Sequence, residues 1–135
     1  MVGLTALAAV AIYAQTVTRD ISLPDTWQFT VDGTSYLTRL EREAVVSGVP
    51  WNTAKALPMS FAKAEQIARA ELRKLVSDEP AWEVHSFQLH RLKHTQHWYY
   101  SVEFSPPAQG HKDSYAYVLL DASGKAGSIE KGHLN

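Results

Sequence analysis

The sequence predicts an α+β domain in which one main amphipathic helix packs on an antiparallel meander of three to four strands. An N-terminal strand and a possible short helix precede these elements. Three observations support this class: a helical apolar period over residues 60–76, alternating strands after residue 80, and strand-like alternation over residues 27–32. A helix followed by a run of strands along the chain is typical of α+β folds. We therefore expect the helix to lie across one face of the sheet.

The main helix is predicted from Ser60 to Val76. Its apolar residues recur at spacings of three and four, which places them on one side: Phe61, Ala64, Ile67, Ala68, Leu72 and Leu75. Ser60 can cap the first turn, because its hydroxyl can accept a hydrogen bond from an unpaired backbone amide. Pro80 ends the helical segment, since proline disfavours helical geometry in the residue before it.

The strands of the meander follow the helix. Residues 81–92 change the phase of their apolar alternation near His85 and Ser86, which predicts a β-bulge. Residues 97–105 alternate cleanly, residues 114–120 are apolar on both faces, and a short last strand is expected around residues 128–130. Turns are predicted at residues 93–96, 106–113 and 121–124.

The first half of the chain begins with a strand. Trp27, Phe29 and Val31 alternate with polar residues, and the pair Asp32-Gly33 predicts a turn after them. Residues 35–47 allow either the second strand of a hairpin or a short helix that Ser35 would cap. The charged residues between the apolar ones favour the helix.

Length and composition limit the class of protein. Residues 16–135 are expected to form a single domain, because 135 residues can bury a core without a metal or disulfide. The net charge of -1 gives no basic surface for nucleic acid. The chain contains no cysteine, which excludes disulfides and a thiol nucleophile.

Residues 1–15 form an uncharged apolar segment that is too short to span a bilayer. Its small residues, such as Ala9 and Ala11, suit a cleavable signal peptide, although no Lys or Arg precedes the apolar run. We interpret it as a signal peptide, so the mature protein is expected in the periplasm or secreted, without a stable membrane span. The alternative is an apolar N-terminal segment folded into the core of a cytoplasmic protein.

The second half, residues 58–130, resembles PepSY-type domains. The matching residues are Ser60, Ala64, Ile67 and Ala68 on the helix, Tyr99–Glu103 on the middle strand, and Val118–Lys125 at the last turn. The chain departs from the pattern at Ser123, where Thr is usual, and at Ala126, where a branched apolar residue is usual. The resemblance implies a non-catalytic module of the bacterial envelope or secreted space. It supplies no catalytic residues.

The histidines raise a competing hypothesis. His90, His94 and His97 would share a face on a helix and could ligate zinc, as in a small histidine-dependent hydrolase or metal-binding enzyme. Because this segment is predicted as a hairpin, we favour exposed histidines without a metal, and we expect no cofactor. Ser47 and Ser123 each precede a glycine in a turn, which backbone geometry explains without nucleophilic chemistry.

The main functional candidate is an apolar excess on the second face of the sheet, which needs a cover. Four residues are expected on the sheet face that points away from the main helix: Tyr99, Tyr115, Tyr117 and Leu119. We favour an explanation in which Trp27, Phe29 or Trp51 packs over this face. The alternative is that another envelope or secreted protein docks there. Tyrosines suit docking because they combine a large contact area with a polar tip.

Overall fold

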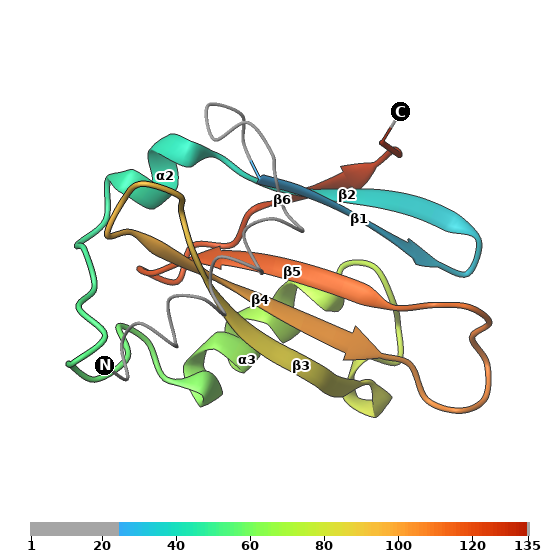
Figure 1. The fold of residues 1–135 in the computed structure, drawn as a ribbon. Helices are drawn as coiled ribbons and strands as arrows, with labels where there is room; N and C mark the ends of the chain where they lie inside the picture. The colour runs from blue at the N-terminus through green and yellow to red at the C-terminus, as the bar shows by residue number, and fades with distance from the viewer. Residues whose placement is uncertain (1–24, 135) are drawn as a thin grey trace, which may run out of the picture.

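The computed structural model describes residues 25–134, which form two antiparallel three-stranded sheets and one main helix (Figure 1). The elements in chain order are β1 (Asp25–Val31), β2 (Thr34–Leu40), α2 (Arg42–Val46), α3 (Phe61–Leu72), the 3₁₀ turn η1 (Glu79–Ala81), β3 (Glu83–Arg91), β4 (Trp98–Ser105), β5 (Ala116–Asp121) and β6 (Ser128–Lys131). The predicted α+β class is confirmed. Residues 1–15, interpreted as a signal peptide, lie outside the described residues.

The second sheet is the predicted meander, with strand order β3-β4-β5. Its β3–β4 pairing shifts register between Val84 and Ser86, which confirms the expected bulge. Figure 1 shows α3 lying against one face of this sheet. Tyr100, Val102 and Phe104 of β4 are fully buried on that face, because they alternate with the residues that point to the other side.

Helix α3 begins where Ser60 caps it, since the Ser60 hydroxyl accepts a hydrogen bond from the Lys63 amide at 3.1 Å. The helix ends at Leu72, earlier than the predicted Val76. Beyond Leu72 the chain tightens, because the Leu75 amide donates to the Leu72 carbonyl at 2.9 Å. Phe61, expected on the buried side, is 41% exposed and stacks on Phe87 instead.

The N-terminal hairpin joins β1 to β2 through Asp32 and Gly33. These residues have φ angles of 50° and 83°, as a type I′ turn requires. This turn matches the right-handed twist of the two strands, so the predicted Asp-Gly turn is confirmed. The hairpin lies above β5 in Figure 1.

The helix expected from Ser35 is wrong over most of its length. Residues Thr34–Leu40 are the strand β2, which pairs with β1 on one side and β6 on the other. Two neighbouring strands satisfy both backbone edges of β2, and this tertiary pairing outweighs the local helical pattern. Only Arg42–Val46 is helical, and its N-cap is Glu41 rather than Ser35.

Strand β6 leaves the meander and joins the first sheet, whose order is β1-β2-β6. Before doing so, the chain runs briefly beside β5, where the Gly127 amide donates to the Leu119 carbonyl at 2.8 Å. A Cβ atom on Gly127 would lie 2.4 Å from the Arg39 carbonyl oxygen, so only glycine fits between the two strands. Residues 126–127 therefore connect the two sheets.

The core has two parts on opposite faces of β4 and β5. The main cluster lies under α3 and includes the helix residues Ala64, Ala68 and Leu72. The second cluster lies on the other face and consists of Leu40, Val45, Leu92, Tyr99 and Leu119. Because neighbouring residues of β5 alternate between the two clusters, this strand is buried on both sides.

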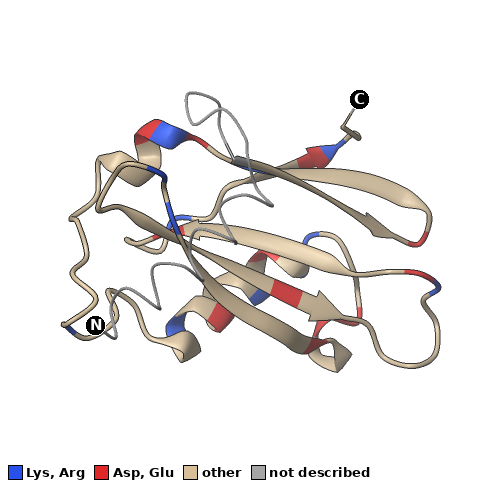
Figure 2. Ribbon diagram, in the orientation of Figure 1, with Lys and Arg blue, Asp and Glu red and all other residues tan. Residues whose placement is uncertain are grey.

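Charged residues of both signs are interspersed along α2 and α3 and also occur near the ends of strands (Figure 2). Among residues 25–134, no helix has the length and apolar character needed to cross a membrane.

Candidate functional site

The four residues of the expected binding face differ in their exposure to solvent. Tyr99 is 4% exposed and Leu119 is fully buried in the second cluster, where Leu40, Val45 and Leu92 pack around them. Tyr115 is 36% exposed and Tyr117 is half-buried. Their rings meet edge to face, with centroids 5.5 Å apart. We call Tyr115 and Tyr117 the tyrosine surface, because only these two of the four residues retain substantial access to solvent.

Trp27 is the aromatic residue that packs beside the tyrosine surface. Its ring lies edge-on to Tyr117, with centroids 5.0 Å apart, and edge-on to His90 at 5.2 Å. The other two expected covers lie elsewhere: Phe29 stacks on Tyr36 in the main cluster, and Trp51 packs against Trp98. Trp27 therefore borders Tyr117, and the other ring that meets Tyr117 is that of Tyr115.

Burial raises the pKa of Tyr117 above its usual value, and the nearby Glu103 and Tyr115 add to this effect. The phenol of Tyr117 consequently stays neutral to a higher pH than an exposed tyrosine does. A neutral hydroxyl at the rim of an aromatic surface can both donate and accept a hydrogen bond with a partner.

The three histidines of the metal hypothesis do not converge. His90 bonds the Ser101 hydroxyl at 2.8 Å and stacks on Tyr99. His94 is exposed at the hairpin tip, where its backbone adopts a φ of 65°, and His97 is half-buried beyond the tip. Within residues 25–134, no three acidic or histidine side chains are grouped so that they could hold a metal ion.

The hydroxyls of the two serines considered for catalysis make local hydrogen bonds at their turns. The Ser47 hydroxyl donates to the Ala44 carbonyl at 3.1 Å, and the Ser123 hydroxyl donates to the Asp121 carboxylate at 2.6 Å. Each bond satisfies a group of the adjacent helix end or turn. Both hydroxyls are therefore engaged in local hydrogen bonds.

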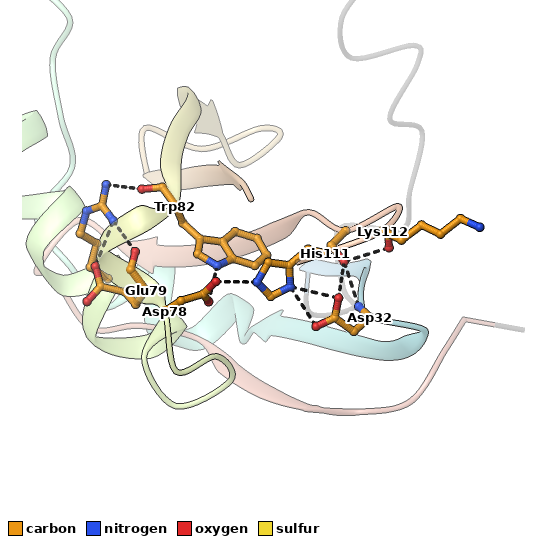
Figure 3. A network of polar contacts seen from close by, with 8 residues as sticks. Asp32, Asp78, Glu79, Trp82, His111 and Lys112 are labelled. Carbon is orange, nitrogen blue, oxygen red and sulfur yellow. Dashed lines mark hydrogen bonds and ion pairs between the residues drawn. The ribbon is translucent and has the colours of Figure 1, made fainter. Parts of the chain in front are cut away.

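A polar network that the sequence did not reveal joins three connections of the fold (Figure 3). His111 lies in the loop between β4 and β5, and its ring is only 9% exposed. Its Nδ1 lies 2.9 Å from the Asp32 carboxylate of the β1–β2 turn, and its Nε2 lies 2.7 Å from the Asp78 carboxylate before η1. We call Asp32, His111 and Asp78 the carboxylate–histidine bridge.

Trp82 supports the bridge from the start of β3. Its indole Nε1 donates to the other Asp78 oxygen at 3.0 Å, and its ring meets His111 edge to face at 5.0 Å. The bonds to Asp78, followed by those to Asp32, raise the pKa of His111 above its usual value, against the opposing effect of burial. The bond from His111, followed by that from Trp82, lowers the pKa of Asp78.

Glu79 lies beside the bridge and is 4% exposed. Two arginines of the helix segment enclose it, so its charge is paired despite the burial. Arg73 Nε donates to its carboxylate at 2.9 Å and Arg69 Nη1 at 3.0 Å, which together lower the pKa of Glu79. Arg69 also donates to the Trp82 carbonyl, so this group ties α3 to β3.

No local pattern could have indicated the bridge. Its residues lie at positions 32, 78 and 111, in three separate connections, and only the tertiary fold brings them together. The arrangement holds loops together rather than exposing a reactive group, because both nitrogens of the imidazole already face carboxylates.

Neither a family model, nor a curated protein, nor a solved structure matches this chain.

Proposed function

We propose that this chain is a non-catalytic binding or regulatory module of PepSY-like type, which acts on a partner protein in the periplasm or outside the cell. The observation that carries the proposal is the tyrosine surface, an edge-to-face pair of accessible tyrosines mounted at the start of a rigid, doubly buried strand. Aromatic side chains on a rigid support lose little conformational entropy on binding. They are also enriched at protein interfaces.

The turn that carries the PepSY resemblance gives further support. Asp121 is 5% exposed, and its carboxylate accepts bonds from the Ser123 and Lys125 amides at 2.9 and 3.0 Å. Gly124 adopts a φ of 96° and lies under the helix, where an added Cβ would be 3.0 Å from Ile67. The motif therefore has a structural reason, which is to close β5 and dock its turn against α3.

The location outside the cytoplasm rests on the apolar residues 1–15. N-terminal sequencing of the mature protein from its native host tests it: a start after residue 9 supports export, and a start at Met1 contradicts it.

The binding function is tested at the tyrosine surface. A photo-crosslinking amino acid in place of Tyr115 should capture one protein in native cells, whereas the same group in place of Lys93 at the exposed hairpin tip should not. With that protein purified, the double variant Tyr115→Ser and Tyr117→Ser should weaken binding at least about tenfold, equivalent to about 1.4 kcal/mol.

Thermal unfolding of the same variant separates a role of these tyrosines in partner binding from a role in covering the core. An unchanged melting temperature with lost binding supports a docking surface. Unchanged binding, or a loss of binding that follows global unfolding, shows instead that the tyrosines only cover the core and contradicts the proposal.

A further inference from the structure

The geometry of the carboxylate–histidine bridge requires a charged imidazole. A neutral imidazole has one N–H donor and one bare nitrogen, whereas an imidazolium has two donors. His111 presents both nitrogens to carboxylate oxygens, at 2.9 Å toward Asp32 and 2.7 Å toward Asp78. If either proton were lost, a nitrogen lone pair would face a carboxylate oxygen at hydrogen-bond distance. The observed arrangement is therefore the doubly protonated one.

The charged groups around the ring come from three elements. The β1–β2 turn contributes Asp32, and the connection after α3 contributes Asp78. Glu79 lies next to Asp78 but is engaged by Arg69 and Arg73. From the loop of His111 itself, Lys112 and Asp113 are exposed to solvent. The two carboxylates of the bridge are thus the charges that contact the ring (Figure 3).

The bridge continues toward the tyrosine surface. The Ser114 hydroxyl accepts a bond from the Asp32 amide at 2.9 Å, and the next residue, Tyr115, donates its amide to the Thr30 carbonyl at 3.0 Å. These two bonds seat the end of the β4–β5 loop on β1. Because His111 holds the same loop to the same turn, its release removes one support of Tyr115.

We propose that the carboxylate–histidine bridge is a proton-operated latch, which holds the β4–β5 loop and Tyr115 in place while His111 carries both protons and frees them when it loses one. The latch would thereby regulate the tyrosine surface by pH. Its effect on partner binding rests on the proposed function, whereas the latch itself can be measured without a partner.

The sign of the pH dependence follows from the pKa shift. The pKa of His111 in the folded protein lies above its usual value of 6.5, so the bridge is fully formed below about pH 6.5. It is lost as the pH rises through the folded-state pKa. Asp78 must also stay ionised, and its lowered pKa extends the closed state to acidic pH.

NMR on the isotopically labelled chain tests the latch. The imidazole signals of His111, assigned with His111→Gln, should titrate at a pH above the usual histidine value. Hydrogen exchange at the amides of Asp32 and Tyr115, corrected for intrinsic rates, should lose up to about tenfold protection per pH unit above that midpoint. The indole N–H signal of Trp82 should move at the same pH.

Substitutions test whether the pH dependence comes from His111 and its contact with Asp78. Asp78→Asn should lower the His111 midpoint, and His111→Gln should keep the protection of Tyr115 low and independent of pH. His94→Gln is the matched control and should leave the pH dependence unchanged. Because Asp78→Asn retains the shape of the side chain, it keeps the test valid if His111→Gln fails to fold.

Two results would overturn the latch: Tyr115 protection that stays constant while His111 titrates, or pH-dependent protection that persists in His111→Gln. Neither outcome depends on a partner. Failure of the latch is therefore distinguishable from failure of the proposed binding function.

Discussion

Gly124 shows how a single residue joins a turn to a helix. Its φ of 96° is one that side-chain-bearing residues rarely adopt, and its Cα faces Ile67 and Met59 of the α3 segment. Gly110 has nearly the same φ, 95°, but no atom lies within 4 Å of its missing Cβ. A comparison of the two glycines therefore separates the cost of backbone strain, which both positions share, from the cost of close packing, which only Gly124 has.

We predict that Gly110→Ala destabilises the fold by about 1 kcal/mol through its positive φ alone. Gly124→Ala should cost at least about 1 kcal/mol more, because its methyl group also meets Ile67. Urea unfolding of both variants measures the difference. Equal losses would show that the α3 side chain moves aside freely.

At the scale of elements, α3 depends on its cap more than on its charges. The Ser60 hydroxyl bonds the Lys63 amide, and residues 61–63 contain no acidic side chain to complement the helix dipole. The beginning of the helix also carries the exposed stack of Phe61 on Phe87, whose rings are 4.6 Å apart. Loss of the cap should therefore loosen the first turn and this aromatic pair together.

We predict that Ser60→Ala lowers the free energy of unfolding by about 1 kcal/mol, whereas Ser60→Asp retains it because a carboxylate also caps and favours the helix N-terminus. Ser77→Ala, at an exposed position after the helix, is the control and should be neutral. Chemical denaturation monitored by far-UV circular dichroism measures the three. A neutral Ser60→Ala would mean that the capping bond is not formed in solution.

At the scale of the whole molecule, β5 joins the two parts of the core. Val118 and Leu120 belong to the main cluster, and Leu119 between them belongs to the second. Removal of one side chain from either cluster should therefore weaken the whole fold rather than one half of it.

We predict that Leu119→Ala costs about 2–5 kcal/mol, the usual range for a fully buried leucine. Leu57→Ala, at a position that is 43% exposed, should cost less than about 0.5 kcal/mol. Tryptophan fluorescence and far-UV circular dichroism should report one coincident unfolding transition for both variants. Two separate transitions would show that the sheets unfold independently.

Local patterns predicted the elements whose structure depends on neighbouring residues. The Ser60 cap, the bulge near His85 and the Asp32-Gly33 turn all follow from short-range geometry. Strand β2 was the less favoured of two alternatives, because its pairing with β1 and β6 outweighs the helical spacing of its residues. Pairing with other strands therefore determined the structure of this segment.

The candidate site was predictable only in part. Tyr99 and Leu119 lie together in the second cluster, as the alternation of β4 and β5 predicts, and Trp27, one of the three expected covers, packs against Tyr117. Burial of Tyr99 and Leu119 depends on Leu40, Val45 and Leu92, which come from three distant segments. The carboxylate–histidine bridge likewise joins three loops, and no periodicity connects residues that lie in separate loops.

Strand β6 gives β2 its second neighbour, and Gly127 seats the connecting chain against Arg39. A nascent chain that has emerged only as far as β5 therefore contains a hairpin with an open outer edge. Such an edge offers free amides and carbonyls to other chains until residues 128–131 emerge. The first sheet is consequently completed only after β5 has been made, and a chain that stalls or is truncated before β6 would be most prone to aggregate.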